Sequence, residues 1–135
     1  GYRIPDYLAK ANAELVLAIQ VETAEGLANI VDIAAVDGVD LIFIGPGDLS
    51  VSIDAMGPAG KDKLDAAIRT IVKTALSAGR AVGIFRPTPD DVATWSAAGI
   101  SFFLLASDTM YLGAGLTAGV IEAKKHKGGL GVAEK

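Results

Sequence analysis

Two acidic residues and one amide are the side chains of this sequence best suited to bind a ligand together. Gln20 and Glu22 stand two positions apart in an apolar run, and Asp48 follows the second of two such runs. In an extended strand, residues two positions apart point to the same face, so Gln20 and Glu22 share one face. Carboxylate oxygens are the ligands that divalent cations such as Mg²⁺ prefer. If Glu22 and Asp48 end neighbouring strands, both reach one cation, and the sequence predicts a metal site there.

The segment Ile-Gly-Pro-Gly-Asp-Leu-Ser at residues 44–50 predicts a turn with anion-binding amides. Two glycines around a proline let the backbone turn sharply, and they leave the amides of Gly47 and Asp48 free. A site built from oxygen ligands favours magnesium or manganese, with cobalt possible. Two other interpretations remain open, because Asp48 could cap a helix or turn and Glu22 could pair with a surface lysine.

Four apolar segments predict the strands that position these residues, at 15–22, 39–45, 81–87 and 100–107. Helical patterns follow them at 24–36, 62–78, 89–98 and 110–125, and a short helix at 6–12 precedes them. Gly79 and Gly99 stand where helix C-caps belong. Alternating strands and helices predict an α/β fold with a parallel sheet, either a doubly wound sheet or four units of a (β/α)8 barrel. Both place ligands at the carboxyl ends of the strands.

The remaining apolar side chains predict the core and one further surface. The strand aromatics Phe43, Phe85, Phe102 and Phe103 are expected in the core. Trp95 is expected to pack on the sheet or on another subunit. The last helix carries a continuous apolar stripe that predicts either local core or a subunit interface, formed by Tyr111, Leu112, Leu116, Val120 and Ile121.

Composition narrows the class of protein. The 135 residues carry 16 acidic and 12 basic side chains, a net charge of −4, which argues against a nucleic-acid partner. With no cysteine there is no disulfide or thiolate zinc site, and no apolar run is long enough to span a membrane. We expect one cytoplasmic domain over residues 1–135 with a flexible tail at 126–135. The first residues show neither an initiator Met nor a signal-peptide pattern, so the chain is expected to be a piece of something longer.

Several motifs together resemble the carboxyl-terminal half of the HpcH/HpaI aldolase family, metal-dependent pyruvate aldolases such as 4-hydroxy-2-oxoheptanedioate and 2-dehydro-3-deoxyglucarate aldolases. The similarity runs from Arg3 to the last helix and rests on Gln-Val-Glu-Thr at 20–23, residues 38–50, Gly-Ile-Phe at 83–85 and Ser-Asp-Thr at 107–109. It implies a (β/α)8 TIM-barrel type of fold, of which this chain supplies about the last four βα units.

The resemblance also implies roles for individual residues. Glu22 and Asp48 match the family's metal ligands, the Gly47 and Asp48 amides match those that hold the pyruvate carboxylate, and Gln20 matches a residue lining the same pocket. The implied reaction is cleavage of a 4-hydroxy-2-oxo acid into pyruvate and an aldehyde through a metal-stabilised pyruvate enolate.

The resemblance leaves two features outside this chain. The family's catalytic His and Arg lie upstream of Gly1, and the one histidine, His126, is expected to be an exposed bystander. The chain by itself is therefore expected to be inactive. In this superfamily the last helix often crosses to a neighbouring subunit, which implies a homo-oligomer.

Arg86 departs from the family, which more often has an apolar residue there. Its guanidinium could clamp the distal carboxylate of a dicarboxylic oxo acid, and a salt bridge to Asp90 or Asp91 is the alternative. Capping of the last helix explains residues 107–109 without a catalytic role.

Three other functions are alternatives to a metal-dependent pyruvate aldolase. A Schiff-base aldolase needs a lysine on a strand, and every lysine lies outside the predicted strands. A citrate-lyase-like acyl lyase would use a related fold and the same carboxylates. A non-catalytic half-barrel is supported by the missing His and Arg.

Overall fold

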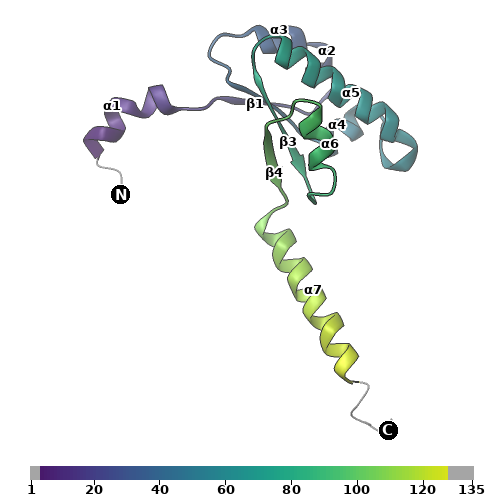
Figure 1. Cartoon of the computed structure of the whole chain (residues 1–135). Coiled ribbons are helices and arrows are strands. Elements are labelled where there is room, and N and C mark those ends of the chain that lie inside the picture. Colours follow the sequence, from purple (N-terminus) through teal and green to yellow (C-terminus); the bar gives the residue numbers. More distant parts are fainter. Residues whose placement is uncertain (1–3, 128–135) are drawn as a thin grey trace.

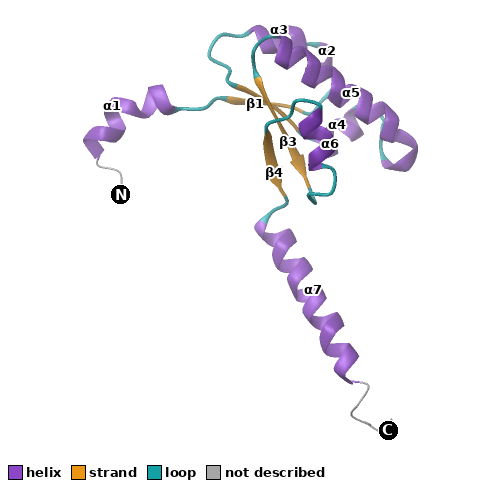
Figure 2. Cartoon of the chain, in the orientation of Figure 1, coloured by secondary structure: helices purple, strands orange, loops and turns teal. Residues whose placement is uncertain are grey.

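The computed structural model describes residues 4–127, in which four strands alternate with helices (Figure 1). The strands are β1 (Ala18–Val21), β2 (Leu41–Ile44), β3 (Ala81–Arg86) and β4 (Phe102–Leu105). The helices are α1 (Ile4–Glu14), α2 (Ala24–Ala28), α3 (Ile30–Ala35), α4 (Pro46–Ser52), α5 (Gly57–Ser77), α6 (Val92–Ala97) and α7 (Asp108–Lys127). Figure 2 shows the small sheet with helices α2 to α6 beside it.

The four strands form one parallel sheet in the order of the chain, β1-β2-β3-β4. Its register places Gln20 opposite Phe43, Phe43 opposite Gly83, and Gly83 opposite Phe102. A doubly wound sheet reverses its strand order at a switch point, whereas this order is sequential. The sheet therefore has the arrangement of a partial (β/α)8 barrel, the alternative that the family resemblance implies.

The core lies on one face of this sheet. Alternate strand residues point toward the helices, and with α4 and α5 they bury the side chains that are almost fully shielded from solvent: Val21, Ile42, Ile44, Leu49, Ile68, Ile71, Val82 and Ile84. Trp95 of α6 is also buried in this core, as the sequence predicts. Burial of Leu, Ile and Val side chains typically contributes about 1.5–3 kcal/mol each to folding, so this layer holds the sheet and helices together.

The other face of the sheet is open within the described residues. Phe102 is 48% exposed and Leu104 is 49% exposed, while Phe43 and Phe85 are half-buried. The prediction that the strand aromatics all lie in the core is therefore wrong for Phe43, Phe85 and Phe102. Phe103 alone points to the helix side and packs against the core, because its position has the opposite parity along β4.

Two helices end as the sequence predicts. Gly79 after α5 and Gly99 after α6 have φ angles of 73° and 106°, in the left-handed region. The Gly79 amide donates to the Leu76 carbonyl and the next amide, of Arg80, donates to the Ala75 carbonyl, which is the Schellman pattern. Each glycine thus turns the chain directly into the following strand.

Most segment boundaries differ from the prediction by a few residues, and β1, predicted at 15–22, spans only Ala18–Val21. Most of the predicted turn at 44–50 instead forms the start of helix α4, because Pro46 occupies the first helical position, where its missing amide loses no bond. The predicted helix 24–36 is two helices, α2 and α3, divided at Asn29. Helix α5 begins at Gly57, five residues before its predicted start.

Helices α1 and α7 project away from the sheet and its covering helices (Figure 1). The apolar stripe of α7 is exposed along its length, at Tyr111, Leu112, Leu116, Val120 and Ile121. The prediction that this stripe packs into the local core is therefore wrong for the described residues, and the alternative, a subunit interface, stays a prediction. Helix α7 also includes His126 and Lys127 of the predicted tail, and residues 128–135 lie outside the described residues. No helix between residues 4 and 127 is both long and apolar enough to span a membrane.

Candidate functional site

Glu22 lies in the short connection between β1 and α2. Strand β1 ends at Val21, and Thr23 is the N-cap of α2, with its Oγ1 accepting a hydrogen bond of 3.0 Å from the amide of Gly26. This cap satisfies one of the free amides at the start of the helix. Strand and cap together fix the backbone on both sides of Glu22, so the half-buried carboxylate stands at the carboxyl end of β1.

Gln20 and Glu22 form a hydrogen-bonded pair on one face of the sheet, as their spacing predicts. The Nε2 of Gln20 donates to the Oε2 of Glu22 at 2.5 Å. No other residue in the described range 4–127 hydrogen-bonds to either side chain, and no lysine in that range pairs with Glu22. The second oxygen of Glu22 and the amide oxygen of Gln20 are therefore left available for a ligand.

The expectation that Asp48 ends a strand is wrong: β2 ends at Ile44, and Asp48 lies in the first turn of α4. Gly45 is the N-cap of this helix, and its carbonyl accepts from the amide of Leu49 at 3.0 Å. Asp48 is exposed, and its carboxylate makes no hydrogen bond or ion pair with any residue that the structure describes. The amides of Gly47 and Asp48 belong to the first helical turn, whose N–H groups have no partner inside the helix. A carboxylate here is favoured by the helix dipole.

A pocket of about 290 Å³ brings most of the predicted site together. Gln20, Gly47 and Asp48 line it, and Glu22 adjoins it through its hydrogen bond to Gln20. The other lining residues are Phe43, Gly45, Pro46, Phe85 and Leu104.

The pocket's apolar wall was missed by sequence reasoning. Phe43, Phe85 and Leu104 form this wall, and the two phenylalanines were expected in the core. Parity along the strands identifies them only once the register is known: Phe43 pairs with Gln20 in the sheet, so both side chains point to the same face.

Arg86 stands at the end of β3 but does not line this pocket; its neighbour Phe85 does. Its Nε donates to Oδ1 of Asp91 at 2.9 Å, and its Nη2 donates to Oδ2 of the same carboxylate. Trp95 Nε1 also donates to that carboxylate, at 3.1 Å. Arg86 therefore forms the salt bridge to Asp91 that was considered as its alternative role. Its clamping of a substrate carboxylate stays a prediction.

The remaining candidates lie outside the pocket. Ser107 Oγ accepts from the amide of Met110 at 3.3 Å, which is the capping role considered for residues 107–109. His126 is exposed on α7, and its Nε2 lies 3.3 Å from Oε1 of Glu122, on the same helix. The lysines of the described chain lie on α1, α5 and α7, away from the strands that would carry a Schiff-base lysine.

A divalent cation fits the chemistry of this donor set. Glu22 and Asp48 offer carboxylate oxygens and Gln20 an amide oxygen, which are ligands for hard cations. Within residues 4–127, no group of three or more His, Cys, Asp or Glu side chains is arranged to hold a metal ion. Two carboxylates alone would leave several coordination positions open for water and substrate, as a catalytic site needs.

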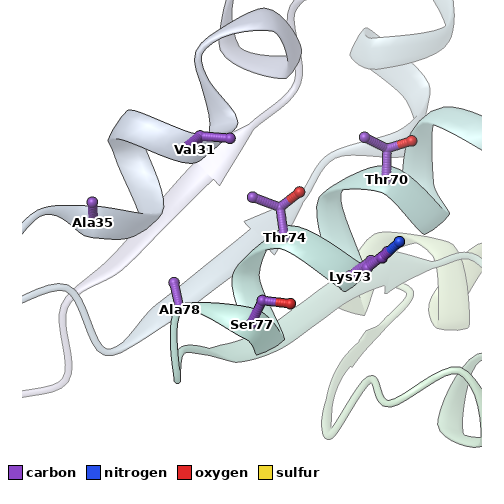
Figure 3. A pocket seen from close by; sticks show the side chains of 7 residues that line it. All are labelled: Val31, Ala35, Thr70, Lys73, Thr74, Ser77 and Ala78. Carbon is purple, nitrogen blue, oxygen red and sulfur yellow. The ribbon is translucent and has the colours of Figure 1, made fainter.

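A second, larger hollow of about 620 Å³ lies on the outer helical layer, between α3 and α5. Figure 3 shows the side chains that line it: Val31, Ala35, Thr70, Lys73, Thr74, Ser77 and Ala78. It contains no acidic residue and none of the predicted site residues. The pocket at the carboxyl ends of the strands is therefore the better candidate for chemistry.

Comparison with known proteins finds relatives that are named as aldolases. A hydroxypyruvate/pyruvate aldolase of Paraburkholderia phytofirmans is 45% identical over 107 residues, covering 79% of this chain and 40% of that protein. The chain spans about two fifths of the length of the curated relatives it matches. The activities in the names of these relatives therefore belong to proteins more than twice as long as the part that this chain matches.

Solved structures show the same fold. An HpcH/HpaI aldolase/citrate lyase family protein from Burkholderia cenocepacia superimposes with a TM-score of 0.79 at 31% identity, covering 88% of this chain and 46% of that one. The citrate synthase SbnG gives 0.80 at 27% identity, with coverage of 92% and 51%. The family model described as HpcH/HpaI aldolase/citrate lyase matches residues 1–113. The chain therefore belongs to the HpcH/HpaI aldolase/citrate lyase family.

Proposed function

We propose that this chain forms the metal- and oxo-acid-binding half of a divalent-metal-dependent aldolase that cleaves a 4-hydroxy-2-oxo acid into pyruvate and an aldehyde. The observation that carries the proposal is the Gln20–Glu22 pair beside a pocket lined by Asp48. Family membership and relatives named as aldolases support the type of reaction.

Each residue of the pocket has a part in this proposal. Glu22 and Asp48 would hold Mg²⁺ or Mn²⁺, with Co²⁺ as a further choice. When bound, the cation would supply Lewis-acid stabilisation of the negative charge that develops on the oxo acid. Gln20 orients the Glu22 carboxylate through its hydrogen bond. The first-turn amides of Gly47 and Asp48 would bind the substrate carboxylate.

The apolar wall of Phe43, Phe85 and Leu104 would exclude water from one side of the bound oxo acid. Charges in such a drier pocket interact more strongly than they do in water. No histidine lines the pocket among the described residues. The group that moves the proton during cleavage is therefore proposed to come from residues outside this chain.

Metal binding is tested by titrating Mn²⁺ into the 135-residue chain by calorimetry. Glu22→Gln and Asp48→Asn each remove a charged ligand while keeping the shape, so each should weaken binding by at least about tenfold. Glu25→Gln is the matched control, because this exposed acid lies on α2 outside the pocket. Equal affinity of all three variants and the parent would contradict the proposed site.

Catalysis is tested separately by measuring pyruvate release from a 4-hydroxy-2-oxo acid with and without Mg²⁺ or Mn²⁺. We expect the 135-residue chain to bind Mn²⁺ and pyruvate without turnover. Metal-dependent turnover would show that the chain holds its own proton-transfer group. Failure to bind either ligand would contradict the proposed metal- and oxo-acid-binding role.

A second candidate is acyl chemistry on a citrate-like acid, and the observation that favours it is the likeness to a structure named as a citrate synthase. The two candidates differ in the ligand that the pocket prefers. Calorimetry with pyruvate and with citrate, each in the presence of Mg²⁺, separates them. Preference for citrate would favour the second candidate.

We also propose that α7 joins copies of this chain into a homo-oligomer. The exposed apolar stripe of this helix supports the proposal, with Leu112 and Leu116 each 63% exposed. Contiguous exposed apolar surface on a soluble protein commonly marks an interface.

A further inference from the structure

Gly45 occupies the point where β2 ends and α4 begins, directly beside Glu22. The sheet pairs Val21 with Ile44, and the Gly45 amide donates to the Val21 carbonyl at 3.3 Å. Its backbone has φ −100° and ψ 86°. This negative φ lies outside the left-handed region, so the conformation itself does not demand glycine. The reason for a glycine must be sought in the space around it.

The space that a side chain at Gly45 would fill is occupied by the Gln20–Glu22 pair. An ideal Cβ there would lie 2.8 Å from Oε2 of Glu22, 3.0 Å from Nε2 of Gln20 and 3.1 Å from Cβ of Glu22. The first two atoms are, in that order, the acceptor and the donor of the 2.5 Å hydrogen bond. A side chain at Gly45 would therefore overlap the position that this pair occupies at the end of β2.

We infer that Gly45 is a positioning residue, whose missing side chain seats the Glu22 carboxylate and the Gln20 amide at the pocket that Asp48 lines. The metal-binding consequence rests on the proposed function, whereas the seating of the pair does not. Groups that orient a metal ligand typically change metal affinity by about 10–100-fold when they are altered. Gly45 would act in this way through exclusion of volume.

The other crowded glycines of the sheet and helices differ from Gly45 in what they would meet. A Cβ at Gly60 would lie 2.1 Å from the backbone carbon of Ala55, and one at Gly83 would lie 2.8 Å from the ring of Phe43. Backbone and packed rings cannot move aside easily. The atoms facing Gly45 are mainly the tips of flexible side chains, which can swing away, so Gly45→Ala should disturb the site without unfolding the chain.

The test compares Gly45→Ala with Gly113→Ala, a control whose added methyl group would meet nothing within 4 Å. We expect Gly45→Ala to bind Mn²⁺ at least about tenfold more weakly than the parent in calorimetry. Its melting temperature should stay within about 4 °C of the parent. The side-chain amide resonance of Gln20 in metal-free NMR spectra should shift, because its short hydrogen bond is broken.

A double-mutant cycle with Gln20→Ala checks that Gly45 acts through the pair. If both changes displace the same carboxylate, their combined loss of Mn²⁺ affinity is smaller than the product of the single losses. Losses that multiply would place the effect of Gly45 elsewhere and overturn the inference.

Three further outcomes bear on whether Gly45 positions the Gln20–Glu22 pair. Parent-like Mn²⁺ affinity together with an unmoved Gln20 resonance overturns the inference. Unfolding of Gly45→Ala overturns it too, because Gly45 would then be a packing residue like Gly60. If the parent itself binds no Mn²⁺, the proposed metal site fails, and the Gln20 resonance still shows whether Gly45 seats the pair.

Discussion

The hydroxyl of Ser52 accepts a hydrogen bond of 2.9 Å from the backbone amide of Ala24, which lies 28 positions earlier in the chain. Ser52 is the last residue of α4, the helix that carries Asp48, and Ala24 is the first residue of α2, two positions after Glu22. One hydrogen bond thus joins the two segments that hold the acidic residues of the candidate site.

Removing this hydroxyl should loosen the site. Ser52→Ala should lower the free energy of unfolding by about 1 kcal/mol, the typical net contribution of one hydrogen bond. It should also weaken Mn²⁺ binding, because α4 would no longer be tied to the start of α2. Urea unfolding and calorimetry measure the two effects. Ser52→Thr keeps the hydroxyl and serves as the control; if Thr and Ala behave alike, the hydrogen bond has no positioning role.

The Arg86–Asp91 pair should contribute to stability. Asp91 accepts from Arg86 and from Trp95, so it ties the end of β3 to α6. The two charged side chains are 22% and 33% exposed, which reduces screening by solvent relative to a surface pair. Asp91→Ala should therefore lower the free energy of unfolding by about 1–2 kcal/mol, as measured by urea unfolding.

Arg86→Lys separates the two roles considered for Arg86. Lysine keeps the charge but cannot form the two-pronged contact with Asp91. If Arg86 only stabilises the fold, Arg86→Lys should lose stability and retain parent affinity for both monocarboxylic and dicarboxylic oxo acids. A selective loss of dicarboxylate affinity in calorimetry would instead support the substrate clamp.

Gly60→Ala should be strongly destabilising although it lies within a helix. Alanine normally stabilises a helix interior by about 1 kcal/mol relative to glycine. Here the new Cβ would lie 2.1 Å from the backbone carbon of Ala55, and such overpacking typically costs about 1–3 kcal/mol or more. We expect the clash to outweigh the propensity and the melting temperature to fall. Gly113→Ala on α7, with open space around it, should raise or retain the melting temperature.

The proposed role of α7 is tested by sedimentation velocity. Leu112, Leu116 and Val120 follow one another at helical spacing along α7. Leu116→Glu places a charge in this stripe and should dissociate the oligomer, because an uncompensated charge is unfavourable in an apolar interface. Ala118→Glu, about half a turn away, is the control. A parent chain that sediments as a monomer would contradict the proposed interface.

Local patterns in the sequence determined the elements of this fold. Short apolar runs predict the strands, and Gly79 and Gly99 predict where α5 and α6 end, since both signals depend on neighbouring residues alone. The spacing of Gln20 and Glu22 likewise predicts their shared face, which the 2.5 Å hydrogen bond confirms. The sequence predicts a turn where α4 begins, because glycine and proline occur both in turns and at the first positions of helices.

The tertiary structure alone decided which face of the sheet is core and which is pocket. Phe43 and Phe103 are both apolar strand residues, yet the first lines the pocket and the second packs against the core. Residue type cannot distinguish these faces, because the difference depends on strand register and on where the helices pack. The space at Gly45 was invisible for the same reason: the atoms that fill it belong to Gln20 and Glu22, more than twenty positions away in the chain, and only folding brings them there.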